Sequence, residues 1–263
     1  MKQAATRRDV FRLLAAVPLL AAGVDCAIAA KVALIERLID EARQLPRVSQ
    51  RIDFISHALL GVRYQANTLI GGPKHPERFV VRDDAFDCVT FCEVVLAAAI
   101  ARDFGAFETS LRRIRYDHGN VQWGQRNHYF ADWSQRNIEN KICQFVPVEP
   151  SVAIDKTVSW HRSLGKRRVS IHAIAKATFL QRADLLSAGD IIGFTSRRSD
   201  LDYFHTGLVA FDKAGVLLLR HASRSRGRVV EEKMAMFVTV NPVKYVSLLR
   251  ATEPDATKAT GKT

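Results

Sequence analysis

Residues 85–93 read Ala-Phe-Asp-Cys-Val-Thr-Phe-Cys-Glu, and this stretch places a cysteine at the start of a predicted helix. Asp87 is a suitable N-cap residue, and residues 94–101 continue as an apolar, helix-tolerant run. Cys88 then lies in the first helical turn, where unpaired backbone N–H groups and the helix dipole favour a thiolate. The same N–H groups can bind an oxyanion. We therefore predict that Cys88 is a nucleophile whose thiol pKa falls well below the ordinary value of about 8.5.

A cysteine nucleophile needs a base, and two downstream histidines are candidates for that role. Residues 203–211 are predicted to form a strand that carries His205, and after a polar turn the next strand delivers His221 near its end. Antiparallel pairing across that turn brings the two imidazoles close together. The predicted triad is Cys88, His205 and His221, in which His221 orients His205. Ser223 or a backbone carbonyl is the alternative orienting group.

The order of these motifs resembles that of a known group of enzymes. A cysteine at a helix start, a Gly-Asp-Ile strand at residues 189–191 and a following His-x-Gly-Leu-Val strand are similar to the NlpC-type, papain-like cysteine peptidases of bacterial cell walls. Within them, the string Phe-Asp-Cys-Val-Thr-Phe-x-Glu, the upstream Gly61-x-x-Tyr64 motif and residues 126–133 resemble the N-acetylmuramoyl-L-alanine-amidase-like subfamily. The resemblance covers residues 51–248. Because Val-Thr follows the cysteine where common NlpC domains have Ser-Gly, substrate details of the common type are not transferred.

The resemblance implies an α+β, papain-like fold in which the nucleophile helix packs on an antiparallel sheet. It implies a cysteine amidohydrolase acting on peptidoglycan, with the bond between N-acetylmuramic acid and L-alanine as the first choice. An endopeptidase that cuts the stem peptide after D-glutamate and a non-catalytic peptidoglycan-binding module are the alternatives. The resemblance also implies that Tyr64 donates its hydroxyl to the oxyanion, although a core aromatic role is equally open. Asp87 is expected to act mainly as the cap, and residues 71–85 to form an extra wall of the cleft.

The segment at residues 126–133 combines a cation, hydrogen-bond donors and flat apolar faces, which suit a sugar and a peptide carboxylate. The predicted substrate-binding residues are Arg126, His128, Tyr129 and Trp133. The alternative is a structural aromatic loop.

The two ends of the chain carry their own signals. Residues 1–29 have a basic start, a short apolar core and an Ala-x-Ala cleavage site, which together indicate a secretory signal peptide too short for a stable membrane span. The string at residues 6–12 resembles a twin-arginine signal, with Val10 where Phe is usual. We therefore expect a periplasmic or otherwise exported protein. Residues 30–250 are expected to form a single domain, and the polar residues 251–263 a disordered tail.

The composition limits the possible partners. The chain has 263 residues, 48% of them hydrophobic, which suffices for one sizeable core. Cleavage after Ala29 removes four basic and two acidic side chains and lowers the formal net charge from +12 to +10. Such a balance favours anionic partners, which outside the cytoplasm are peptidoglycan carboxylates and membrane surfaces. No nucleic acid is expected, because the basic residues are scattered and no recognition motif accompanies them.

The cysteine count fits a nucleophile better than a disulfide scaffold. Signal cleavage leaves Cys88, Cys92 and Cys143, an odd number of thiols. Cys92 is expected to be a small buried hydrophobe, and a bridge between Cys92 and Cys143 stays open. Neither a metal nor a cofactor is expected, since no paired C-x-x-C or H-x-x-x-H arrangement occurs.

Hydrophobic periodicity predicts helices first and strands second. The predicted helices cover residues 32–42, 48–60, 88–102, 107–116 and 130–137, with a loop over 61–84. The predicted strands cover residues 146–148, 158–160, 169–173, 191–194, 203–211, 216–219, 228–231 and 243–248.

Overall fold

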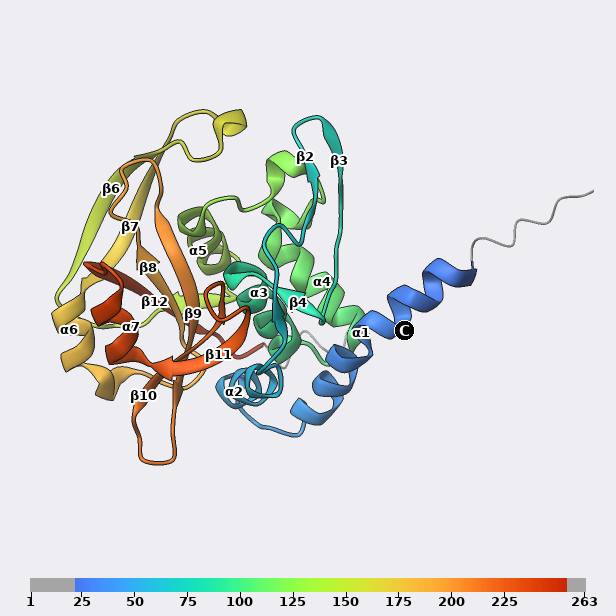
Figure 1. The fold of residues 1–263 in the computed structure, drawn as a ribbon, viewed down its shortest axis with the longest axis horizontal. Coiled ribbons are helices and arrows are strands. Elements are labelled where there is room, and N and C mark those ends of the chain that lie inside the picture. The colour runs from blue at the N-terminus through green and yellow to red at the C-terminus, as the bar shows by residue number, and fades with distance from the viewer. Residues whose placement is uncertain (1–21, 255–263) are drawn as a thin grey trace, which may run out of the picture.

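The structure, a computed structural model, describes residues 22–254. Its first five helices gather on one side of a strongly curled sheet (Figure 1). Along the chain they are α1 (Ala22–Ala42), α2 (Val48–Ala58), α3 (Cys88–Ile100), α4 (Phe104–Arg115) and α5 (Phe130–Glu139). All five predicted helices are therefore present, with ends that differ by a few residues, apart from α1, which begins ten residues earlier.

The sheet has ten strands in the order β4-β1-β11-β10-β9-β8-β12-β7-β6, with β5 also paired to β12. The bounds are β1 (Arg63–Tyr64), β4 (Ala85–Phe86), β5 (Cys143–Phe145), β6 (Ser151–Val158), β7 (Arg167–Ala175), β8 (Ile191–Thr195), β9 (Tyr203–Phe211), β10 (Leu217–Ser223), β11 (Arg228–Lys233) and β12 (Tyr245–Ala251). The α+β class is confirmed. The sheet is mixed rather than wholly antiparallel, because β1 and β4 pair in parallel.

Helix α3 lies at the centre of the molecule because it is apolar on nearly every side, a pattern typical of a buried helix. It contacts β9 and β10 on one side and α2 and α4 on the other. Its one buried acid, Glu93, accepts a hydrogen bond of 2.7 Å from Nε of Arg115, and the guanidinium also donates to the carbonyl of Val80 at 2.6 Å. This ion pair compensates the burial of both charges and ties α3 to α4.

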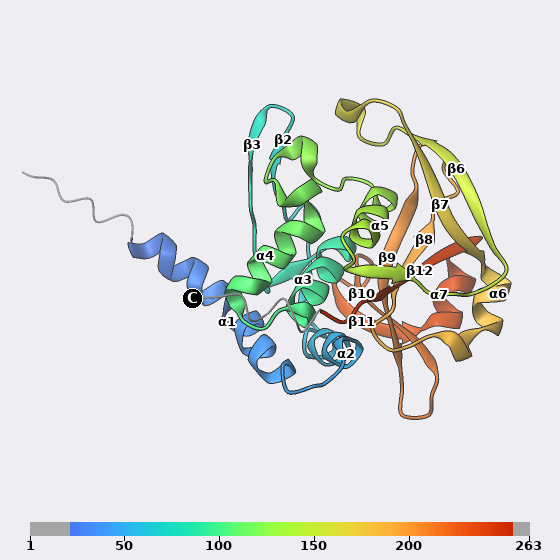
Figure 2. The same cartoon turned by 180° about the vertical axis from the view of Figure 1, so that it is seen from behind.

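The opposite face of the sheet is covered by two short helices that the sequence patterns did not predict, α6 (Lys176–Gln181) and α7 (Met234–Val240) (Figure 2). Phe179 of α6 and Phe237 of α7 enter a second apolar core together with Phe194 of β8. Because both faces of the sheet are buried, strands β8 and β9 have nearly continuous apolar sequences.

Several predicted elements differ from the observed ones. The predicted loop at residues 61–84 contains β1 and a hairpin of β2 (Ile70–Gly72) and β3 (His75–Arg78). The predicted strand at 146–148 is replaced by β5 just before it, and the one at 158–160 by the longer β6. Such short segments have too few residues for a period to be recognised.

The chain ends are only partly described. Most of the predicted signal peptide lies outside the described residues, and within 22–254 no helix has the length and apolar character that crossing a membrane requires. The predicted tail begins later than expected, because Ala251 belongs to β12 and Glu253 accepts a hydrogen bond of 2.7 Å from the backbone N–H of Val48. The rest of that tail lies outside the described residues.

Candidate active site

Cys88 is the first residue of α3, directly after its N-cap. The Asp87 carboxylate accepts hydrogen bonds from the backbone N–H groups of Val89 at 3.1 Å and Thr90 at 2.8 Å, while the Thr90 hydroxyl accepts one from the Asp87 N–H at 2.9 Å. This reciprocal capping box holds the first turn in place, so the predicted capping role of Asp87 is confirmed. As a residue Cys88 is partly exposed, although its sulfur is desolvated, whereas Cys92, one turn further on, is fully buried.

Tyr64 stands beside Cys88 because of the parallel pairing of two short strands. In that pairing Tyr64 is opposite Phe86, two residues before the cysteine. Burial raises the pKa of Tyr64, and the negative charges that Cys88 and Asp87 can carry raise it further, so the phenol stays protonated and able to donate. The predicted oxyanion donor is therefore within electrostatic reach of the thiol.

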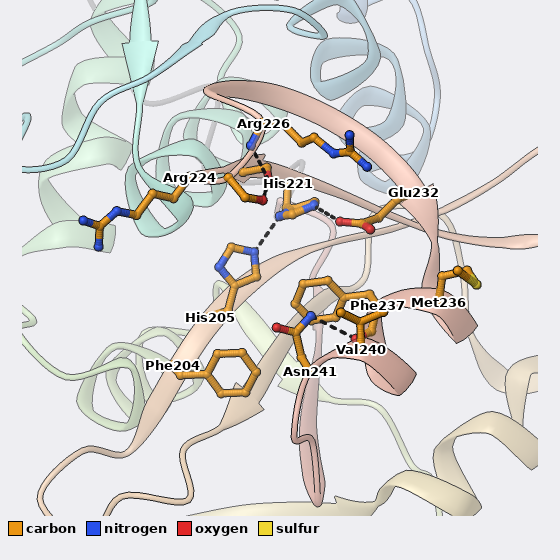
Figure 3. Close-up of a pocket in the computed structure, with 12 residues that line it drawn as sticks. Phe204, His205, His221, Arg224, Arg226, Glu232, Met236, Phe237, Val240 and Asn241 are labelled. Atoms are coloured by element: carbon orange, nitrogen blue, oxygen red, sulfur yellow. Dashed lines mark hydrogen bonds and ion pairs between the residues drawn. The ribbon is translucent and has the colours of Figure 1, made fainter.

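His205 and His221 form a hydrogen-bonded pair that continues to a carboxylate. Nε2 of His205 lies 2.6 Å from Nδ1 of His221, and Nε2 of His221 lies 2.8 Å from Oε1 of Glu232 (Figure 3). His205 comes from β9, His221 from β10 and Glu232 from β11, three neighbouring strands. The structure thus brings the two predicted histidines together and adds Glu232, which sequence reasoning missed.

The order of partners determines where the protons lie. A carboxylate can only accept, so Nε2 of His221 donates to Glu232, and Nδ1 of the neutral ring is left as an acceptor. Nε2–H of His205 donates to that nitrogen. Nδ1 of His205 is then unprotonated, which is the state a general base needs. Glu232 therefore sets the tautomer of His205 through His221.

Gly207 explains why the motif reads His-x-Gly. A Cβ atom at this position would lie 2.9 Å from Cβ of His221 and 3.0 Å from the carbonyl oxygen of Arg220. Any side chain there would force β9 and β10 apart or displace His221. The glycine thus lets the two histidine-bearing strands approach closely.

Aromatic rings enclose the histidine pair. Phe237 lies 5.4 Å from His205 and 5.5 Å from His221, and Phe194 stacks at 6.2 Å from His205, all between ring centroids. Burial therefore lowers the pKa of His205 to about 3, with a further contribution from His221. Burial also lowers the pKa of His221, although Glu232 opposes that shift. Both imidazoles are neutral at pH 7.

The pKa of the Cys88 thiol is raised, whereas the sequence predicted that it is lowered. Burial, followed by the charge of Asp87, raises the pKa of Cys88 to about 12, while the N–H groups of Thr206, Cys88 and Val89 oppose the rise. The helix start is present as predicted, but desolvation of the sulfur outweighs it. The prediction of a low thiol pKa is therefore wrong, and at pH 7 the thiol and the imidazole of His205 are both neutral.

Alkylation measures this state directly. Because the raised thiol pKa lies above the working range, the iodoacetamide rate at Cys88 should climb about tenfold per pH unit from pH 6 to 9, with no acidic plateau. Peptide mapping by mass spectrometry separates Cys88 from Cys92 and Cys143. A plateau below pH 6 would instead indicate a resting thiolate–imidazolium pair.

The predicted substrate-binding residues do not form an open surface. Arg126 is occupied by Glu77 of the β2–β3 hairpin, to which its Nε donates at 3.0 Å and its Nη2 at 2.5 Å. His128 places Nε2 2.7 Å from the carbonyl of Trp123, and burial lowers its pKa to about 4. The hairpin therefore anchors the Arg126 segment. Residues 71–85 were expected to form an extra wall of the cleft, but none of them lines the cavity beside His205 and His221.

Tyr129 and Trp133 belong to the core. Trp133 is fully buried and stacks on Phe130 with a centroid distance of 5.0 Å. Tyr129 is 1% exposed, and its hydroxyl accepts a hydrogen bond of 3.1 Å from the backbone N–H of His161. The prediction that these two rings contact a sugar is wrong, because Trp133 of α5 and Tyr129, the residue before α5, are both buried in the core. The alternative role given above for residues 126–133, a structural aromatic segment, agrees with this burial.

The remaining thiols are not joined. Cys92 lies 3.9 Å from the hydroxyl of Thr206, and Cys92 and Cys143 are both buried, free cysteines. Among residues 22–254, no three His, Cys, Asp or Glu side chains are arranged to hold a metal ion.

A cavity of about 910 Å³ opens beside the histidine pair (Figure 3). Its residues come from β9, from β10 with the turn after it, and from β11, α7 and the residue that follows α7. They are Phe204, His205, His221, Ser223, Arg224, Ser225, Arg226, Glu232, Met236, Phe237, Val240 and Asn241.

Comparison with known proteins agrees with this geometry. The family model described as AmiA-like, N-acetylmuramoyl-L-alanine amidase-like, matches residues 54–244. The chain is similar to the crystal structure of an N-acetylmuramoyl-L-alanine amidase from Bacteroides uniformis, with 26% identity, a TM-score of 0.69, and coverage of 78% of this chain and 99% of that one. Protein LPG0564 from Legionella pneumophila, of family DUF1460, shares the fold with a TM-score of 0.75 at 18% identity, covering 89% of this chain and 98% of its own. Among curated proteins there is no significant match.

Proposed function

The chain belongs to the N-acetylmuramoyl-L-alanine amidase-like family, and from this premise we propose that it is a cysteine amidase of papain-like type acting on peptidoglycan. The proposed bond is the amide between N-acetylmuramic acid and L-alanine. The observation that carries the proposal is the hydrogen-bonded series His205–His221–Glu232, together with Cys88 at the start of a buried helix, where the thiol lies within reach of the backbone N–H of Thr206, the residue after His205.

The proposed reaction has two steps. Nδ1 of His205 takes the proton from Cys88 as the sulfur attacks the scissile carbonyl, and the imidazolium then gives that proton to the leaving amine. A water molecule, deprotonated by the same nitrogen, cleaves the thioester and regenerates the thiol. Because thiol and imidazole are both neutral at rest, proton transfer accompanies attack rather than preceding it.

The developing oxyanion needs donors that are already in place. The first N–H groups of a helix have no partner within it, and the N–H of Cys88 is one of these. Tyr64 supplies a second donor, since its raised pKa keeps the hydroxyl protonated. These two groups are the proposed oxyanion hole.

Incubation with purified muropeptides tests the proposal. Mass spectrometry of the products is expected to detect free disaccharide and a peptide that begins with L-alanine, and neither should form with Cys88→Ala. Products cut after D-glutamate would identify a stem-peptide endopeptidase instead. Binding without any cleavage would identify a non-catalytic module.

We also propose that the chain is exported, on the basis of the leader-like residues 1–29. Replacing the arginine pair, in an Arg7→Lys/Arg8→Lys double variant, is expected to retain the protein in the cytoplasmic fraction. Fractionation followed by N-terminal sequencing measures both the location and the cleavage site, which is expected close to Ala30. If the double variant reached the periplasmic fraction as well as the parent protein does, the twin-arginine route would be ruled out. Export by another route would then still be the proposal.

A further inference from the structure

The cavity beside His205 and His221 has two chemically different walls. Helix α7 contributes an apolar wall, in which Met236 is 58% and Val240 76% exposed. The turn between β10 and β11 contributes a polar wall that contains Arg224 and Arg226. A ligand that fits both walls carries an aliphatic part and an anionic part.

Acidic side chains hold several arginines of the described chain, but they do not hold the two arginines of this turn. Among the described residues Arg126 pairs with Glu77, Arg220 with Asp53, and Arg250 with Asp190. Arg224 and Arg226 are exposed, and no ion pair is found for either of them within residues 22–254. Glu232 is the one carboxylate among the described residues that line the cavity, and it is engaged by His221 at 2.8 Å. The cavity therefore carries uncompensated positive charge.

The turn is held in place against the catalytic centre. The backbone N–H of Tyr64 donates to the carbonyl of Gly227 at 2.8 Å, and the hydroxyl of Ser223 lies 3.2 Å from that of Ser225 and 3.4 Å from the N–H of Arg226. Gly227 adopts a φ of 67°, which favours glycine and closes the turn. Arg224 is thus presented by a pre-organised loop bonded to the strand of the proposed oxyanion donor.

The guanidinium groups of Arg224 and Arg226 lie on different sides of the turn between β10 and β11 (Figure 3). Their side chains extend in opposite directions from the turn (Figure 3). Arg224 lies within electrostatic reach of Tyr64, since its positive charge lowers the pKa of that hydroxyl against the larger raising effects of burial, Cys88 and Asp87. An anionic group bound by Arg224 therefore lies close to the scissile carbonyl, whereas one bound by Arg226 lies farther along the cavity.

His205 lines the cavity, and the proposed mechanism therefore assigns the cavity to the leaving group. His205 protonates the departing amine in the proposed mechanism, so the peptide attached to that amine extends from His205 into the space beside it. In a muropeptide this part is the stem peptide, which is rich in carboxylates, while the opposite part is the uncharged sugar ring.

From these contacts we infer that Arg224 is a specificity residue that binds a carboxylate of the stem peptide, so that the protein selects acidic over amidated peptides. The apolar wall of α7 accommodates the aliphatic side chains of the same peptide. This inference rests on the proposed function and adds the substrate class to it.

A matched pair of ligands tests the inference, namely N-acetylmuramoyl-L-alanyl-D-glutamate and its D-isoglutamine counterpart, which differ in one carboxylate. Titration calorimetry with the full-length Cys88→Ala protein is expected to give about 5- to 10-fold tighter binding of the acid, a modest ratio because the arginine is exposed. Adding Arg224→Gln should reduce the ratio to below about twofold, whereas adding Arg226→Gln, with the same charge loss in the same turn, should preserve it.

The outcomes separate this inference from the proposed function. Equal binding of acid and amide, or equal effects of the two arginine variants, would overturn the role of Arg224. Selective binding of the acid, combined with no release of L-alanyl peptide by the parent protein, would retain that role and reject the amidase activity. Circular dichroism melting checks that both turn variants remain folded.

Discussion

Cys88→Ala is expected to remove muropeptide hydrolysis altogether, a loss of at least about 10⁴-fold in kcat, while leaving the protein folded. The side chain begins α3 but carries none of its packing, which rests on the fully buried residues from Phe91 onward. The capping box uses the side chains of Asp87 and Thr90 and backbone N–H groups but not the thiol, so it survives the substitution. Product analysis by mass spectrometry and thermal unfolding measure the two expectations.

Cys92→Ala is the matched control, since Cys92 lies one turn further along the same helix and is fully buried. Its thiol contacts the hydroxyl of Thr206 at 3.9 Å, so its loss creates a small cavity and lowers stability by about 1 kcal/mol. Activity should be largely retained. Equal inactivation of two folded variants would show that the nucleophile is misassigned.

Local signals suffice for the parts of the site that lie within one element. The capped start of α3 could be predicted because Asp87 and the apolar run after Cys88 are adjacent in the chain. The proximity of His205 and His221 could be predicted from a single hairpin. These are short-range relations, and secondary-structure patterns express them well.

Glu232 was missed because its role depends on the register of the next hairpin. In the structure Leu219 is paired with Glu232, so the carboxylate lies diagonally across from His221. The predicted strand ended at residue 231, just before Glu232, whereas β11 continues to Lys233. A four-residue turn at 224–227 pairs Ser223 with Arg228. Extending this register along both strands would have predicted that Glu232 lies diagonally across from His221.

The errors concern properties that distant segments determine. The raised thiol pKa follows from burial of the sulfur in the assembled domain, an effect that the residues flanking Cys88 do not reveal. In the sequence Arg126 has the character of a ligand-binding cation, but in the structure it donates to Glu77 of the β2–β3 hairpin. Trp133 has the character of a ring that stacks on a sugar, but it is buried in the core. In each case tertiary burial decided between two roles that the residue type allowed.

His221→Ala is expected to lower kcat by about 10³-fold with little change in KM, because the ring orients His205 without touching substrate at the scissile bond. Its removal leaves Nε2–H of the buried His205 without an acceptor, and the imidazole can then adopt the tautomer that protonates Nδ1. His75→Ala, at an exposed position in β3, is the control and should leave kcat unchanged.

Glu232 separates the two ways in which the hydrogen-bonded series can act. If its task is to accept the Nε2–H of His221 and so select the tautomer, Glu232→Gln keeps an acceptor and should lose less than about tenfold in kcat, whereas Glu232→Ala should lose about 100-fold. The ¹⁵N chemical shifts of the two histidines report directly which ring nitrogens are protonated in each variant. In the parent protein Nδ1 of His205 should be unprotonated, and in Glu232→Ala a mixture of tautomers should appear. Equal losses for Gln and Ala, with unchanged shifts, would mean that the carboxylate acts by its charge alone, and the tautomer assignment would then fail.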